Sequence, residues 1–150
     1  MRVVLQRVKE ASVTVAGEVI SKIGQGFLIL LGIEADDTQD DINWLSGKTA
    51  RLRVFGDEND AMNNSIIDVD GEIIVVSQFT LLASTKKGNR PSFLKAARPD
   101  VAIPLYKAFV LQLEKDLQKK IHTGEFGAMM DVALINDGPV TILIDSKNKD

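Results

Sequence analysis

The first third of the chain alternates between apolar and polar positions with the period of a β-strand. The alternation covers residues 3–8 and 12–15, and Gly17 offers a turn before a further run at residues 19–23. Residues 27–33 are almost continuously apolar, which is typical of a strand buried on both faces. The pattern therefore predicts a sheet with residues 27–33 near its centre.

Two later segments have the three- and four-residue spacing of amphipathic helices. Residues 36–38 can cap the first of them, whose apolar positions are Ile42, Leu45, Thr49 and Leu52. The second covers about residues 100–120, and its apolar stripe consists of Ala102, Leu105, Phe109, Leu113 and Leu117. Both helices are predicted to cover a sheet.

The remaining apolar runs predict further strands. Asp70-Gly71 separates residues 66–69 from residues 73–79 and predicts a hairpin between them. Residues 132–135 and 140–144 are predicted to be two strands joined through Gly138-Pro139. Because no linker or repeat interrupts the sequence, we expect one domain over residues 1–150. The predicted fold class is mixed α/β, with a largely antiparallel sheet and two main helices.

Composition narrows the classes of function. The chain has 150 residues, a net charge of −3 and no cysteine, which excludes disulfides and thiol nucleophiles and is consistent with a cytoplasmic location. The longest apolar run, residues 27–31, is too short to span a bilayer, so we expect no membrane association. The acidic balance disfavours a protein that coats nucleic acid, but a local patch such as Lys86, Lys87 and Arg90 can hold phosphates.

Familiar catalytic side chains are scarce. His122, the one histidine, sits beside the predicted end of the second helix, where an exposed structural role is expected. No Gly-x-Ser-x-Gly motif accompanies it, and no cluster of residues has metal-ligand spacing. The acidic pairs 36–37, 40–41 and 57–58 are interpreted as solvated charge. An enzyme of this composition would work mainly with backbone groups, hydroxyls and the functional groups of its substrate.

Two short segments join strand-like runs to small polar residues: 77–81 (Ser-Gln-Phe-Thr-Leu) and 136–141 (Asn-Asp-Gly-Pro-Val-Thr). Backbone N–H groups at the end of the first run can bind a developing oxyanion. Thr80 has no adjacent base, so we expect it to orient a group rather than to act as a nucleophile. In the second segment, the missing Cβ of Gly138 allows a ligand to approach the backbone closely.

These segments, in this order and about sixty residues apart, closely resemble the D-aminoacyl-tRNA deacylase family. The resemblance covers essentially the whole chain. It also includes the motifs at residues 6–8, 11–15, 52–55, 62–63, 88–93 and 123–130. Members of that family release D-amino acids from mischarged tRNA in the cytoplasm.

The resemblance implies a homodimer with its active site at the interface and with no cofactor or obligatory metal. The Gly138-Pro139 segment, in cis, of one copy is expected to enter a pocket of the other and to exclude L-amino acids. The terminal ribose 2′-hydroxyl of tRNA is expected to assist attack on the ester. The expected catalytic residues are Ser77, Gln78, Phe79 and Thr80. Those expected to bind substrate and select chirality are Gly138, Pro139, Arg7, Met129 and Asn136, while Lys86, Lys87 and Arg90 are expected to bind tRNA.

Glycine on tRNA is a second expected substrate, because steric exclusion cannot reject an amino acid that lacks Cβ. Three alternatives remain open. One is the related animal-type deacylase, which tolerates certain L-amino acids, although Arg7 and the intact motifs count against it. The others are a non-catalytic nucleic-acid-binding module and a metal-independent esterase of small molecules.

Overall fold

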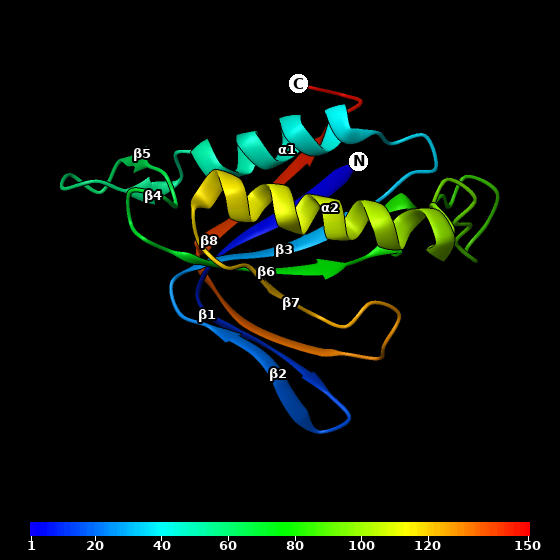
Figure 1. Cartoon of the computed structure of the whole chain (residues 1–150), viewed down its shortest axis with the longest axis horizontal. Coiled ribbons are helices and arrows are strands. Elements are labelled where there is room, and N and C mark those ends of the chain that lie inside the picture. Colours follow the sequence, from blue (N-terminus) through cyan, green and yellow to red (C-terminus); the bar gives the residue numbers. More distant parts are fainter.

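The main sheet of the protein is built around β1 (Arg2–Val15), which pairs with three other strands. The structure is a computed structural model that describes residues 1–150. Strand β1 pairs antiparallel with β2 (Glu18–Ile23), β3 (Gly26–Gly32) and β8 (Asp131–Asp145). The predicted runs at residues 3–8 and 12–15 are thus parts of one continuous strand, which Figure 1 shows crossing the molecule.

The other edge of the sheet is parallel. Strand β3 pairs with β6 (Glu72–Ser77), and β6 pairs with the short β7 (His122–Thr123), both in parallel. Strand β3 therefore lies between β1 and β6, and every one of its residues except Leu30 is buried, as the continuous apolar run predicts. A separate two-stranded sheet is formed by β4 (Phe55–Gly56) and β5 (Met62–Asn64).

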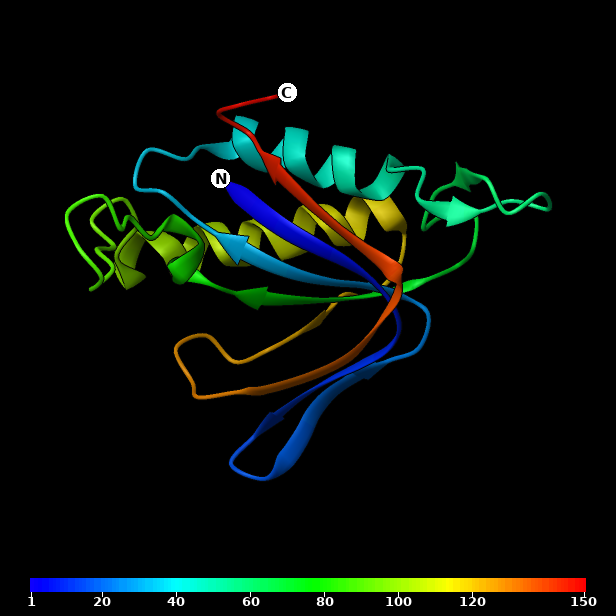
Figure 2. The same cartoon turned by 180° about the vertical axis from the view of Figure 1, so that it is seen from behind.

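Both predicted helices are present and lie together on one face of the sheet. They are α1 (Gln39–Arg51) and α2 (Pro99–Leu117), and Figure 2 shows them behind the strands. The carboxylate of Asp41 accepts a hydrogen bond from the Thr38 N–H at 2.8 Å, which starts α1 where the sequence predicts. Leu45 of α1 and Phe109 of α2 join the buried core over β3. No helix combines the length and apolarity needed to cross a bilayer.

The predicted hairpin around Asp70-Gly71 is wrong. Residues 66–70 form consecutive turns, and β6 pairs with β3 instead of with its predecessor in sequence. The Asp68 carboxylate accepts hydrogen bonds from the Ser65 N–H and hydroxyl at 2.8 and 3.1 Å, which curls the backbone. Ile66 is fully buried within this curl. The apolar run is therefore a packed turn rather than a strand.

The two strands predicted on either side of Gly138-Pro139 are one strand, β8, with a large bulge. Gln6 of β1 faces Thr141, and Val8 faces Asn136. Four residues of β8, 137–140, therefore lie opposite the single residue Arg7. Within this bulge the Gly138–Pro139 peptide bond is cis, and both residues are exposed.

The acidic pairs before and in α1 are not all solvated, contrary to the sequence-based interpretation. Asp37 is buried and lies 2.6 Å from the ammonium of Met1, whose side chain is also buried. The Ser146 hydroxyl accepts a hydrogen bond from this ammonium at 3.0 Å and donates one to Asp41 at 2.7 Å. These contacts join the start of β1, the start of α1 and the segment after β8.

Asp41 makes this network sensitive to acid. Burial by itself raises the pKa of Asp41. Hydrogen bonds from Ser146 and Thr38 and the nearby ammonium of Lys147 lower the pKa by more than burial raises it, so that the resulting pKa is about 2. Because the folded state favours the charged carboxylate, Asp41 contributes to the free energy of unfolding above pH 4. This contribution is lost as the pH falls from about 4 to about 2, where the folded form also takes up the proton.

We therefore predict that Asp41→Asn lowers the free energy of unfolding by about 2 kcal/mol at pH 7. The difference from the unsubstituted protein should shrink as the pH falls from 4 to 2. Urea unfolding at a series of pH values measures both effects. Asp40→Asn is the matched control, because Asp40 is exposed in the same helical turn and has no ion-pair partner. An equal loss in both variants would contradict the assignment.

Candidate active site

The largest apolar hollow opens at the end of β6 and has a volume of about 660 Å³. Its lining includes Ser77, Gln78, Phe79, Phe93, Phe126 and Met129. Three of the four predicted catalytic residues are therefore at one place, together with Met129 from the predicted selectivity set. An apolar hollow with a few polar groups at one end is the usual form of a small-ligand site.

The polar end of this hollow is formed where the strand changes into a helix. Strand β6 ends at Ser77, and residues 79–82 form the 3₁₀ helix η1 (Phe79–Leu82) rather than the continued strand predicted to residue 79. The N–H groups of Phe79 and Thr80 begin this helix and so have no partner within it. Of these two residues only Phe79 lines the hollow, so its N–H is the nearer candidate to bind an oxyanion.

Thr80 is exposed and lies beside the hollow rather than in its wall. Its hydroxyl accepts a hydrogen bond from the side-chain amide of Gln78. Arg2 holds the same helix from behind, donating to the Leu81 carbonyl at 2.8 Å while it pairs with Asp145 at 3.0 Å. The Gln78–Thr80 pair thus sits on a turn that Arg2 fixes to the start of β1 and the end of β8, which lie side by side.

Aromatic side chains form the walls of the hollow. Phe79 and Phe93 meet edge to face with ring centroids 5.0 Å apart. Phe126 packs against Tyr106 of α2 at 5.9 Å, and the Tyr106 hydroxyl donates to the buried Val75 carbonyl at 2.7 Å. Burial raises the pKa of Tyr106 to about 12, so this phenol stays protonated and remains a hydrogen-bond donor.

A second cluster surrounds the bulge of β8. The guanidinium of Arg7 donates from Nε to the Asp137 carbonyl at 3.1 Å and from Nη1 to the Val54 carbonyl at 2.5 Å. Its Nε also lies 3.4 Å from the Asp137 carboxylate. Arg7 therefore ties the bulge to the segment that follows α1, and its role in orienting the bulge toward a substrate stays a prediction.

Asn136 holds the bulge from within. Its side-chain carbonyl accepts a hydrogen bond from the Val140 N–H at 2.9 Å, and its amide donates to the Thr141 hydroxyl at 2.9 Å. These bonds close the backbone around residues 137–139. Asn136 is thus a support of the Gly138-Pro139 segment in this chain and not part of the hollow's wall.

The structure does not bring the two clusters together within one chain. Gly138, Pro139, Arg7 and Asn136 lie outside the lining of the hollow at Ser77. His122 lies in β7, half-buried and opposite Ile74, instead of at a helix end, and it does not line the hollow either. Lys86, Lys87 and Arg90 line a different hollow with a volume of about 290 Å³.

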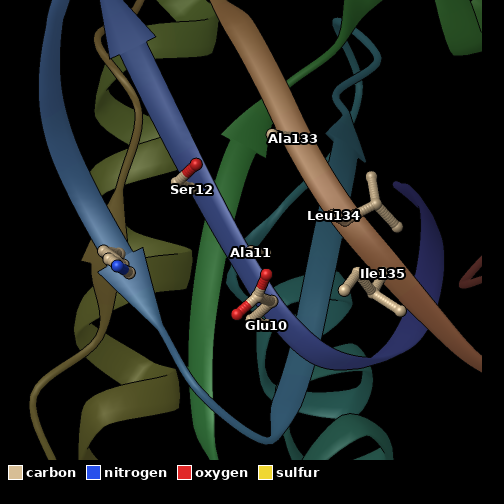
Figure 3. Close-up of a pocket in the computed structure, with 7 residues that line it drawn as sticks. Glu10, Ala11, Ser12, Ala133, Leu134 and Ile135 are labelled. Atoms are coloured by element: carbon tan, nitrogen blue, oxygen red, sulfur yellow. The ribbon is translucent and has the colours of Figure 1, made fainter.

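Two other features offer weaker sites. A hollow of about 240 Å³ lies on the sheet at β1 and β8, where Figure 3 shows Ser12 near Ala133 and Glu10 near Ile135. It has no aromatic wall. The carboxylates of Glu34, Asp36 and Asp37 also lie close together. The Met1 ammonium and the Lys147 ammonium already supply positive charge to these carboxylates.

Most residues that line the larger hollow were not part of the sequence-based site, among them Phe93, Phe126 and Arg98. Phe93 and Phe126 belong to the motifs at residues 88–93 and 123–130, which contribute to the family resemblance. Those motifs were the available signal, but nothing in their spacing showed that they face Ser77. Arg98 precedes α2 and carries no comparable signal.

The chain was compared with known proteins. A family model described as D-Tyr-tRNA(Tyr) deacylase matches residues 4–145. Proteins named D-aminoacyl-tRNA deacylase from Flavobacterium johnsoniae and Parabacteroides distasonis are 65% and 61% identical to this chain, and each match covers all of both chains.

Solved structures are similar as well. One described as "c-Myc DNA Unwinding Element Binding Protein" has a TM-score of 0.91 and 45% identity, and covers 97% of this chain and 98% of its own. Another, described as "Structural Analysis of a probable eukaryotic D-amino acid tRNA deacylase", has a TM-score of 0.83. It is 17% identical and covers 95% of this chain and 97% of its own, so it shows the fold alone.

We predict that Asn136→Ala loosens the bulge without unfolding the chain. The Val140 N–H loses its acceptor, so its amide hydrogen should exchange faster, and the free energy of unfolding should fall by about 1 kcal/mol. Hydrogen exchange and urea unfolding measure these effects. Asn43→Ala is the control, because the exposed Asn43 bonds only to Gln39 in the same helix. Unchanged exchange at Val140 would show that Asn136 does not hold the bulge.

Proposed function

The chain belongs to the D-Tyr-tRNA(Tyr) deacylase family, and from this premise we propose that it hydrolyses the ester of D-aminoacyl-tRNA in a site completed by two copies of the chain. The curated relatives are named as deacylases, so the general reaction is that of a hydrolase. The observation that carries the composite site is the separation, within one chain, of the Ser77 hollow from the Gly138-Pro139 bulge. Such a reaction belongs in the cytoplasm, where aminoacyl-tRNA is used.

The surface of the chain supports association with a second copy. Strand β8 pairs only with β1, so it is an edge strand, and its Ile135 and Leu143 are 49% and 63% exposed. Met129 at the mouth of the hollow is 92% exposed. Exposed apolar side chains in such number at an edge and at a hollow are typical of an interface. Gly138 and Pro139 of the bulge are exposed on this edge strand, and in the proposed dimer they enter the partner's hollow.

Selection of the D-configuration follows from which atoms the bulge presents. Gly138 has a φ of +126° and no Cβ, so its backbone can approach a ligand closely. A backbone wall next to the Cα of the bound amino acid leaves no room for an L side chain. It cannot exclude glycine, which has no side chain, so glycyl-tRNA is a second substrate of the proposed site.

The proposed chemistry needs few protein side chains. Water attacks the ester carbonyl carbon, the bond to the ribose 3′ oxygen breaks, and a proton passes to that oxygen as it leaves. The N–H groups at the start of η1 stabilise the oxyanion that forms on the carbonyl oxygen. The neighbouring ribose 2′-hydroxyl orients the water and relays the proton. The Gln78–Thr80 pair positions the ester.

We predict that Gly138→Ala folds but loses selective hydrolysis. The added Cβ would lie 3.0 Å from Arg7 Nη2 and from Val140 Cγ2, at a φ that L residues rarely adopt. The bulge must shift, at a cost of about 1–3 kcal/mol, so kcat/KM for D-tyrosyl-tRNA should fall about ten- to hundredfold. Hydrolysis of D- and L-tyrosyl-tRNA is measured side by side.

Gly17→Ala is the matched control, because Gly17 also has a positive φ, +80°, but nothing lies within 4 Å of its Cβ position. Mixing Gly138→Ala with Phe79→Ala tests the composite site directly. A mixed dimer has one intact site, so hydrolysis should be faster when the two impaired variants are combined than with either variant alone. Full activity in a monomer, or an unchanged D-over-L preference in folded Gly138→Ala, would exclude the proposed site.

A second prediction concerns the source of catalysis. Thr80→Ala should lower kcat about ten- to hundredfold, well short of the roughly 10⁶-fold loss expected for a covalent nucleophile. The rate of hydrolysis of an aminoacyl-tRNA that ends in 2′-deoxyadenosine should be lower by about a hundredfold or more, because this substrate lacks the hydroxyl that relays the proton. His122→Ala is the control and should keep its rate. Capture of an acyl-enzyme on Thr80 or Ser77, or normal cleavage of the deoxy substrate, would contradict the mechanism.

A further inference from the structure

Positive charge is concentrated in one part of the sequence. Residues 73–99 contain five cations, Lys86, Lys87, Arg90, Lys95 and Arg98, and no carboxylate. The rest of the chain holds the other thirteen cations and all twenty-one carboxylates, although the net charge of the whole is only −3. A segment of 27 residues without an acid is therefore the positive end of an otherwise negative molecule.

Four of these cations line one hollow. Lys86, Lys87, Arg90 and Lys95 surround a space of about 290 Å³ together with the hydroxyl residues Ser84 and Ser92. The backbones of Ser84 and Ser92 exchange two hydrogen bonds, at 2.8 and 2.9 Å, which close the loop between them. The hollow thus has a defined base, and its functional groups are ammonium, guanidinium and hydroxyl donors.

None of the four cations has a counter-charge within the chain. The ion pairs of the structure involve the Met1 ammonium, Arg2, Arg7, Lys119 and Lys147. The four side chains at the hollow are exposed and make no hydrogen bond to protein. Their mutual repulsion is relieved only by an anion from outside. Leu94, which also lines the hollow, is 96% exposed and offers an apolar surface to a base or ribose next to that anion.

The hollow and the candidate active site share the same two short segments. Phe93 lines the active-site hollow, whereas its neighbours Ser92 and Leu94 line the basic one. In η1, Phe79 lines the first hollow and Leu82 the second. The two spaces are thus separated by little more than η1 and one extended strand of backbone. A ligand whose reacting ester lies in one can place its adjoining groups in the other.

We propose that the hollow lined by Lys86, Lys87, Arg90 and Lys95 binds the backbone phosphates of the single-stranded 3′ end of tRNA, next to the terminal aminoacylated nucleoside. This inference rests on the proposed function, since it takes the ester in the neighbouring hollow as its reference point. Lys95, Ser84 and Ser92 join the predicted tRNA-binding residues in this assignment. The hollow binds RNA through phosphate charge and therefore carries no preference for the amino acid.

The test compares D-tyrosyl esters of increasing length: of adenosine, of the trinucleotide CCA, and of full tRNA. The variant is Lys86→Gln/Lys87→Gln, and the matched control is Lys115→Gln/Lys120→Gln, which removes two exposed, unpaired cations of the acidic remainder. We expect the loop variant to raise KM for the CCA and tRNA esters and to leave the adenosine ester, which has no phosphate, unchanged. Single-turnover rates at saturating enzyme should be those of the unsubstituted protein.

Salt provides the second readout. Each phosphate contact to a single strand contributes about 0.7 to the slope of log(kcat/KM) against log[salt], so the loop variant should have a slope shallower by about 1.4. When the salt concentration is raised fourfold, the fold-decrease in kcat/KM should therefore be about seven times smaller for the loop variant than for the unsubstituted protein. The control and the conservative Lys86→Arg/Lys87→Arg should keep the original slope.

The outcomes separate the two proposals. An unchanged slope and KM in the loop variant, or an equal loss on the adenosine ester, would overturn the phosphate site and leave the hydrolytic function standing. Absence of D-tyrosyl-tRNA hydrolysis by the unsubstituted protein would overturn the proposed function. In that case, binding of uncharged tRNA decides the phosphate site: the loop variant must still bind more weakly than the control, and equal binding overturns it.

Discussion

The antiparallel pairing of β1 with β8 is the constraint on which the other features depend. The two strands run side by side for nearly their whole length, with two shifts of register. At Arg7 four residues of β8 face one of β1, and between Val8 and Glu10 the extra residue lies on β1. At its other end, the same pairing places the start of β1 beside the end of β8, where the Met1 ammonium contacts Asp37. The β1–β8 pairing therefore positions both this buried contact and the exposed bulge.

A polar cluster keeps the bulge in one shape. Arg7 reaches the carbonyls of Val54 and Asp137, and Asn136 reaches the Val140 N–H across the three residues between them. A bulge held by several hydrogen bonds in this way presents its backbone atoms in one arrangement. In the proposed site, this arrangement lets a chain with one histidine and no cysteine discriminate between mirror-image ligands by backbone geometry.

The sequence predicts the parts of this fold that local chemistry determines. Periodicity locates α2 and the buried β3, and the Thr38 cap locates the start of α1. It fails at residues 66–70, where side-chain hydrogen bonds from Ser65 and Asp68 override an apolar run. The hollow at Ser77 is predictable in part, but Phe93 and Phe126 reach it from distant segments, and no local pattern records such a contact. The position of Arg7 opposite the bulge depends on the register between β1 and β8, which are more than 100 residues apart in sequence, and no local pattern records that register either.

The uneven distribution of charge has a consequence for how the protein would meet the proposed tRNA substrate in solution. A polyanion that drifts toward the acidic majority of the surface is repelled, whereas one that drifts toward residues 73–99 is drawn in. Such an uneven charge distribution would turn the basic segment toward an approaching polyanion within about a Debye length, some 8 Å at physiological ionic strength. A larger fraction of collisions then occurs at the basic face, so the charge pattern raises the rate of productive association before any specific contact forms.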